Sequence, residues 1–167
     1  MTQIDKINHK EILISKILKK KTIIGVIGLG YVGLPLSILF AKKKFKVLGF
    51  DSNKNKVKLI NSGKSYIERI SNTEVKLLLK KGKCFFEFEK ISECDVIIIC
   101  VPTPLNLKNN PELGHVRATI KSIKKYLKEQ QVLILESTSY PGTTREEVVQ
   151  KLDKNLIPGK NFFIGFS

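Results

Sequence analysis

The 167-residue sequence predicts an α/β fold: a doubly wound, mainly parallel sheet of about six strands with helices on both faces, preceded by an N-terminal amphipathic helix. Two observations predict this architecture. Short apolar, β-branched runs alternate with stretches of helical periodicity, which is typical of strands joined by crossover helices. Some of these runs, such as DVIIICV at 95–101, are almost continuously apolar, as expected of parallel strands covered on both faces.

The first 21 residues predict a leading amphipathic helix that packs on the domain. Within residues 4–20, five apolar side chains fall in one arc of a helical wheel: Ile4, Ile7, Ile14, Ile17 and Leu18. No linker or change of composition interrupts residues 22–167. They are numerous enough for one domain with its own core, so we expect them to fold as one unit.

Six strands and five further helices are expected in that domain. Gly63 and Gly82 follow two of the helices and are expected to end them, while Thr144 and Glu147 have capping-box spacing at the start of another. The expected strands are residues 22–27, 46–50, 84–89, 95–101, 132–137 and 162–166. The expected helices are residues 31–43, 54–62, 73–81, 114–128 and 144–153.

Residues 22–41 carry no charge and lie between two lysine triplets. Their length would suit a membrane-spanning helix, which needs about 20 apolar residues. However, four glycines and a proline crowd into eleven positions, and each glycine weakens a helix by about 1 kcal/mol relative to alanine. The Gly-x-x-x-Gly spacing of packed membrane helices is absent from this stretch. We therefore favour a strand, a turn and a helix here, and we expect no membrane partner.

The glycines form the pattern Gly-x-Gly-x-x-Gly between the first expected strand and the following helix. Gly28 permits a tight turn, Gly30 lets the backbone approach a pyrophosphate, and Gly33 lets the helix pack closely on the strand. Free amides at the helix start, together with the helix dipole, attract phosphate groups. The pattern in this context predicts the nucleotide-binding turn of a Rossmann-type domain.

An acidic residue supports a dinucleotide as the ligand. Asp51 ends the second expected strand, about 20 residues beyond Gly30, where an acid binds the ribose hydroxyls of NAD and repels the 2′-phosphate of NADP. The alternative is that Asp51 only caps the helix that starts near Lys54. Because strand, glycine turn, helix, strand and acid follow one another in register, we favour NAD.

Two later segments are expected at the same edge of the sheet, because ligands of doubly wound folds lie at the carboxyl ends of the strands. Residues 101–113 and 136–144 leave two expected strands and carry hydroxyls and prolines. They would lie beside the nicotinamide half of a dinucleotide. The alternative is that Pro102, Pro104 and Pro141 only shape turns.

The three cysteines, Cys84, Cys94 and Cys100, show neither metal-ligand spacing nor an even disulfide framework. We therefore expect a reducing, cytoplasmic location and no metal site. The chain's two histidines, His9 and His115, are distant from them in sequence, so a catalytic thiol within these residues is not expected.

The formal net charge of +15 comes from 30 basic and 15 acidic residues, and 27 of the basic residues are lysines. Such a field attracts polyanions. The lysines nevertheless occur in short scattered runs, without interleaved aromatic side chains for base stacking. Solvated helix faces explain this pattern better than nucleic-acid binding, so no specific nucleic-acid partner is expected.

Five motifs, in this order and spacing, resemble the N-terminal NAD-binding domain of the UDP-sugar 6-dehydrogenases, which are also called the UDP-glucose/UDP-mannose dehydrogenase family. They are IGVIGLGYVGLPL, GFD, GKSYIE, ICVPTPL and LESTSYPGTT. The third and fifth are most similar to UDP-N-acetylglucosamine 6-dehydrogenase. The resemblance implies an NAD-dependent, two-step oxidation of the C6 alcohol of a UDP-sugar to a carboxylate, for surface-polysaccharide precursors. In that chemistry a cysteine thiol captures the aldehyde and water hydrolyses the resulting thioester.

The resemblance also implies roles for particular residues of this chain. The backbone at five positions would hold the pyrophosphate: Gly28, Gly30, Tyr31, Val32 and Gly33. Asp51 would bind the adenosine ribose, and Lys56 stands where the family has a basic residue near it. Val101 and Thr103 would line the cofactor, and Thr138 would contact it and position water and substrate. The alternative for Thr138 is a strand-end hydroxyl bonded to backbone.

Members of this family are much longer than 167 residues. The resemblance places the catalytic cysteine, glutamate, lysine and asparagine, the dimer-forming helix and most of the UDP-sugar site in a part without counterpart here. We therefore expect an NAD-binding half that is inactive alone, lacking the family's homodimer contact. The alternative is a truncated Rossmann module that binds only a dinucleotide or a polyanion.

Overall fold

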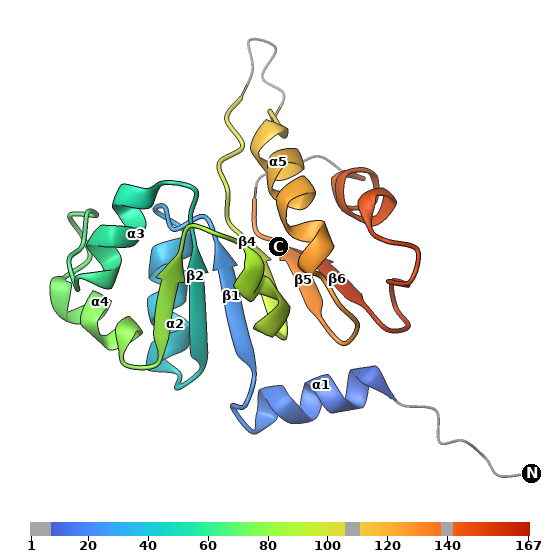
Figure 1. The fold of residues 1–167 in the computed structure, drawn as a ribbon, viewed down its shortest axis with the longest axis horizontal. Coiled ribbons are helices and arrows are strands. Elements are labelled where there is room, and N and C mark those ends of the chain that lie inside the picture. The colour runs from blue at the N-terminus through green and yellow to red at the C-terminus, as the bar shows by residue number, and fades with distance from the viewer. Residues whose placement is uncertain (1–7, 106–110, 138–141) are drawn as a thin grey trace, which may run out of the picture.

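The computed structural model describes residues 8–105, 111–137 and 142–167, which form one six-stranded sheet with helices around it (Figure 1). The order is β3-β2-β1-β4-β5-β6, and every neighbouring pair is parallel. This confirms the expected doubly wound α/β sheet. The strands are β1 Ile23–Ile27, β2 Lys46–Phe50, β3 Gly82–Phe85, β4 Val96–Ile99, β5 Val132–Leu135 and β6 Phe163–Phe166.

Apolar side chains cover both faces of this sheet because successive residues of a strand point to opposite sides. In β1, Ile24 and Val26 belong to one cluster of buried side chains and Ile27 to the other. The first cluster includes side chains of α2 (Gly33–Lys42), α3 (Lys54–Asn61) and α4 (Asn72–Leu79). The second includes side chains of α5 (Gly114–Ile123). The continuous apolar runs of the sequence are thus explained by burial on two faces.

The order of the strands creates a switch point between β1 and β4. From β1 the chain proceeds to β2 and β3 in one direction, and from β4 it proceeds to β5 and β6 in the other. In such sheets the crevice outside the carboxyl ends of the strands at this point receives ligands. The glycine turn follows β1, so it lies at the switch point.

The expected leading helix is shorter in the described residues. Helix α1 spans His9–Leu18 and begins with Asn8, whose side chain accepts a hydrogen bond from the Glu11 amide. Part of the expected range, with Ile4 and Ile7, lies outside the described residues. The helix buries Leu13, whereas Ile14, Ile17 and Leu18 of the expected apolar arc are exposed. The arc expected to pack on the domain is therefore not the face that α1 buries.

Tertiary packing shortens the third strand. β3 begins at Gly82 and ends at Phe85, and a 3₁₀ helix follows at Glu89–Glu93, so the expected strand 84–89 is wrong beyond its second residue. Phe85 and Phe88 both stack on Phe50, with ring centroids 5.8 and 6.2 Å away. As β3 is an edge strand with one neighbour, these ring contacts override the extended pattern.

Two expected helices also differ. α5 ends at Ile123, and Lys124–Tyr126 continue as a 3₁₀ turn, which falls short of the expected end at residue 128. Thr144–Val148 form a π-helical turn followed by a 3₁₀ turn, and no side-chain capping bond starts it. The expected capping box is wrong because Glu147 binds Arg117 and Lys151 instead.

Across the described segments, no helix combines the length and the apolar character needed to cross a membrane. The uncharged stretch 22–41 is instead divided between β1, the glycine turn and most of α2.

Candidate functional site

The glycine turn after β1 is shaped by close backbone contacts. Gly28 has φ +89°, and its amide donates a 2.8 Å hydrogen bond to the carbonyl of Phe50. A Cβ at Gly28 would lie 2.7 Å from the carbonyl oxygen of Cys100, and one at Gly33 would lie 1.8 Å from that of Gly28. A Cβ at Gly30 would meet nothing within 4 Å. The turn is therefore pressed against the end of β4 on one side and open on the other.

Asp51 links this turn to the end of β2. One carboxylate oxygen accepts a 2.9 Å hydrogen bond from the Leu29 amide and the other a 2.8 Å bond from the Asn53 amide. The Lys56 ammonium lies 3.9 Å from the first oxygen. The cap of α3 is Asn53, whose side chain accepts from the first amides of that helix. The alternative that Asp51 caps α3 is therefore wrong.

Tyr66 also stabilises the glycine turn. Its hydroxyl donates a hydrogen bond to the carbonyl of Leu29, and the Lys56 ammonium lies 5.5 Å from its ring centroid. Burial of the ring, with the nearby charge of Asp51, raises the pKa of Tyr66, so the hydroxyl keeps its proton. The sequence analysis gave Tyr66 no role. The signal that could have identified it is its place in the GKSYIE motif.

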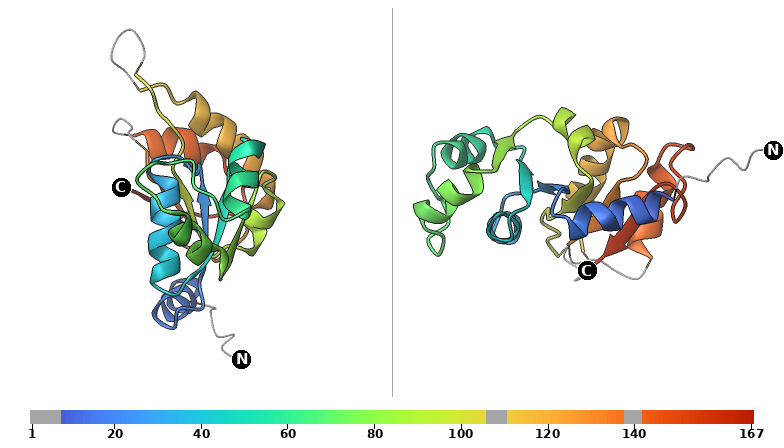
Figure 2. Two further views of the ribbon diagram at one scale, coloured as in Figure 1. Left: turned by 90° about the vertical axis from the view of Figure 1, so that its left-hand side faces the viewer. Right: turned by 90° about the horizontal axis from the view of Figure 1, so that it is seen from below.

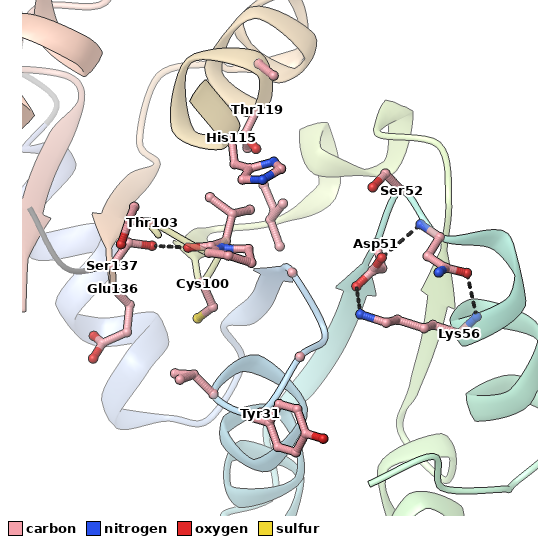
Figure 3. A pocket seen from close by; sticks show the side chains of 18 of the residues that line it. Tyr31, Asp51, Ser52, Lys56, Cys100, Thr103, His115, Thr119, Glu136 and Ser137 are labelled. Atoms are coloured by element: carbon pink, nitrogen blue, oxygen red, sulfur yellow. Dashed lines mark hydrogen bonds and ion pairs between the residues drawn. The ribbon is translucent and has the colours of Figure 1, made fainter. Parts of the chain in front are cut away.

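A cleft of about 900 Å³ opens between the glycine turn, the ends of β2, β4 and β5, and α5 (Figure 3). It is lined by most of the residues that the sequence singled out: Gly28, Gly30, Tyr31, Val32, Asp51, Lys56, Val101 and Thr103. Gly33 does not line the cleft; it allows α2 to approach the turn. Thr138 lies outside the described residues.

The sequence analysis gave no individual role to the other lining residues. Ser52 and Phe88 follow β2 and β3, where the strand-end rule could have found them. His115 and Thr119 reach the cleft from α5 (Figure 3), and Ser122 of the same helix also lines it. Only the packing of α5 on the sheet brings them there. Glu136 and Ser137 belong to the segment expected beside the nicotinamide half.

Ser137 joins the two strand ends at this side of the cleft. Its hydroxyl donates a 2.8 Å hydrogen bond to the carbonyl of Val101, so the segment after β5 holds the segment after β4 (Figure 3). This contact fixes the backbone that leads into Pro102 and Thr103. It thereby stabilises part of the cleft wall.

None of the three cysteines can supply a ready nucleophile. Cys84, Cys94 and Cys100 are all buried, and burial raises the pKa of each thiol to about 12. Because the thiolate is the reactive form, these side chains are suited to packing. The described residues also contain no cluster of histidine, cysteine and carboxylate side chains that could hold a metal ion.

The residues around the cleft fit a dinucleotide. The volume is within the range typical of cofactor sites. Gly30 exposes backbone to the opening, α2 starts three residues later, and helix starts attract phosphate. Asp51 is 8% exposed and retains lone pairs beyond those used by two amides, so hydroxyl groups could donate to it.

Comparison with known proteins agrees with this geometry. Residues 22–164 match the UDP-glucose/GDP-mannose dehydrogenase family, NAD binding domain. The chain is 36% identical to UDP-N-acetyl-D-glucosamine 6-dehydrogenase of Pseudomonas aeruginosa over 146 residues, covering 86% of this chain and 34% of the relative. It is 42% identical to UDP-N-acetyl-D-mannosamine dehydrogenase of Campylobacter jejuni over 124 residues, covering 72% and 30%.

A solved structure is similar as well. The UDP-N-acetyl-mannosamine dehydrogenase Cap5O from Staphylococcus aureus superposes with a TM-score of 0.79 at 31% identity, over 87% of this chain and 36% of that one. The chain thus spans about a third of the length of the curated relatives it matches. It belongs to the UDP-glucose/GDP-mannose dehydrogenase family, and it contains that family's NAD-binding domain.

Proposed function

We propose that this chain is the NAD-binding part of an enzyme that oxidises C6 of a UDP-N-acetylhexosamine, specifically UDP-N-acetylglucosamine, to the uronate with two NAD. The product would serve surface-polysaccharide synthesis in the cytoplasm, a location that free cysteines favour. One observation carries the proposal: the cleft at the switch point combines open space beside the backbone of Gly30 with the buried carboxylate of Asp51. Relatives that act on N-acetylated UDP-sugars support the substrate class.

In this proposal the cofactor lies along the cleft. The backbone from Gly28 to Val32, with the start of α2 behind it, holds the pyrophosphate. Asp51 accepts hydrogen bonds from the adenosine ribose, and the ion pair with Lys56 helps to hold its carboxylate in place. Val101 and Thr103 line the nicotinamide half, and Thr138 positions water and substrate.

The part played by this chain is binding and orientation. NAD, when bound, supplies the hydride acceptor. The thiols described above are protonated and buried, so the covalent step of the family chemistry cannot use them. We propose that the nucleophile, most of the UDP-sugar site and the homodimer contact belong to the part of the enzyme that these residues do not include.

The test is calorimetric titration of the chain with NAD, for the wild type and Asp51→Asn. Asn keeps the shape but loses the charge, and its NH2 group cannot accept the bond that one carboxylate oxygen takes from a backbone amide. Hydrogen bonds to a charged group are worth about 1.5–3 kcal/mol. We expect NAD affinity to fall roughly tenfold to a hundredfold. The variant should also discriminate less against NADP, because the charge that repels the 2′-phosphate is gone.

Asp95→Asn is the matched control. Asp95 likewise accepts from a backbone amide, that of Ile23 at 2.8 Å, and contacts Lys16 at 2.7 Å. It lies where β4 begins, at the opposite edge of the sheet. An equal loss of NAD affinity in Asp95→Asn, or no binding by the folded wild type, would contradict the assigned site.

A second assay tests whether this chain can catalyse the oxidation by itself. The chain is mixed with NAD and UDP-N-acetylglucosamine, and NADH is followed by absorbance. We expect no NADH from these 167 residues. Release of NADH would show that the chemistry is contained in this chain, and it would overturn the assignment of the nucleophile to another part.

A further inference from the structure

The positive charge of this protein is gathered at one edge of the sheet. In an all-parallel sheet, every segment that enters a strand lies at the edge opposite the cleft. We call these entering segments the amino edge. They carry a large set of exposed lysines. They are Lys19, Lys20, Lys21, Lys42, Lys43, Lys44, Lys46, Lys80, Lys81, Lys83, Lys124, Lys125, Lys128, Lys154 and Lys160. By contrast, Lys56 is the lysine among the residues lining the cleft.

Acidic side chains are fewer than lysines at this edge; besides the three paired ones described next, Glu11, Glu129 and Asp153 lie in α1 and the entering segments. Asp95 is bound by Lys16 and by a backbone amide, and Glu74 is bound by Lys42. Glu93 is bound by Lys90. The exposed lysines of the edge therefore outnumber its acidic side chains, and the surface carries a net positive charge. Their segments are far apart in sequence, so only the fold collects them.

Helix α1 lies across the amino edge, below the strands (Figures 1 and 2). Leu13 and the 2.7 Å Lys16–Asp95 ion pair attach it to the domain. Ile14 and Leu18, one helical turn apart, are 44% and 75% exposed. The helix thus presents apolar side chains to solvent immediately before Lys19, the first residue of a lysine triplet.

We propose that the amino edge, with α1, docks on an anionic lipid bilayer; this peripheral contact differs from the sequence expectation of no membrane partner, which was drawn from the lack of a spanning helix in residues 22–41. Lysines near such a surface each contribute favourable electrostatic energy. A helix that combines lysines with exposed Ile and Leu can also bury apolar side chains at the headgroup boundary. Stable anchoring generally needs two such signals, and here both occur on the same edge.

The same surface is poorly suited to nucleic acid. Single-stranded binding uses exposed aromatic side chains as stacking platforms. At the amino edge the ring of Phe45 is buried beneath Lys20, and that of half-buried Tyr126 is covered by Lys125. In the proposed docking geometry the cleft, at the opposite edge, faces away from the bilayer. NAD would then reach it freely.

The experiment is flotation of the chain with vesicles of phosphatidylcholine, with or without phosphatidylglycerol. Three exposed lysines of the amino edge are replaced together by glutamine: Lys19, Lys21 and Lys43. The matched control replaces three exposed lysines elsewhere: Lys54, Lys58 and Lys64. Leu18→Ser tests the apolar contact. Urea unfolding of each variant verifies that it is folded.

We expect binding to phosphatidylglycerol vesicles alone, weakened by salt. The amino-edge triple should reduce the partition coefficient about fivefold per lysine, roughly a hundredfold in total, while the control triple has little effect. Leu18→Ser should reduce it severalfold with an unchanged salt dependence. Equal binding to neutral vesicles, or an equal loss in the control triple, would overturn the proposal. The proposal would also be overturned if Leu18→Ser bound vesicles as well as the wild type does and the wild type were retained on single-stranded DNA. That result would indicate a surface that binds polyanions in general.

Discussion

The hydroxyl of Tyr66 provides a sharp test of how the glycine turn is held. Tyr66→Phe removes one oxygen and leaves the ring to pack on the core and beneath Lys56. The Leu29 carbonyl then loses its donor, and Leu29 is fully buried. A buried acceptor left without a partner costs about 1–3 kcal/mol, which lowers Tm by roughly 2–4 °C for each kcal/mol in a chain of this size.

The turn is also the predicted pyrophosphate site, so part of this loss should appear in NAD binding. Affinity falls about fivefold for each kcal/mol transmitted to the turn. Thermal unfolding and calorimetric titration of the same variant separate the two effects. Tyr126→Phe, at the amino edge, is the control. Unchanged stability and affinity in Tyr66→Phe, or equal changes in the control, would refute the reasoning.

Three further outcomes are expected. Gly28→Ala should cost at least about 2 kcal/mol of unfolding free energy and abolish NAD binding, because φ is +89° and the Cβ would lie 2.7 Å from the Cys100 carbonyl oxygen. Gly30→Ala should preserve urea stability but weaken NAD binding in calorimetry, because its Cβ points into open space that a phosphate would fill. The pKa of Glu147 is lowered from 4.5 to about 2, mainly by hydrogen bonds from Arg117. Its stabilising contribution should therefore be complete above pH 4.5 and disappear as pH falls towards 2, so urea curves of Glu147→Gln and wild type should converge there. A pH-independent difference would contradict this.

Local patterns in the sequence were sufficient for the first half of the fold. β1, the glycine turn, α2 and β2 are close to where periodicity and glycine spacing predict them. These features depend on neighbouring residues: backbone freedom at Gly28, an apolar run, and an acid at a strand end. Their positions in the cleft follow from the rule that parallel strands share one carboxyl edge.

Errors occurred where distant contacts outweighed the local pattern. The aromatic alternation around Phe85 favours a longer strand, but the rings stack on Phe50 and the chain turns away. Thr144 and Glu147 have the spacing of a cap, but the carboxylate is better satisfied by Arg117 from α5. In each case the contacts with a residue remote in sequence stabilise the observed structure more than the local conformational preference stabilises the expected one.

The sequence by itself determined the excess of lysine and the absence of an even cysteine framework, and the spacing of Gly28, Gly30 and Gly33 predicted the ligand-binding turn. The tertiary structure decided which residues surround that turn and where the charge lies. Tyr66 reaches Leu29 because α4, which follows its loop, packs on α2, and His115 reaches the cleft because α5 covers the opposite face. The lysines form one surface because all six strands run in the same direction. Such arrangements depend on which elements become neighbours in space, and spacing along the chain carries no direct record of that.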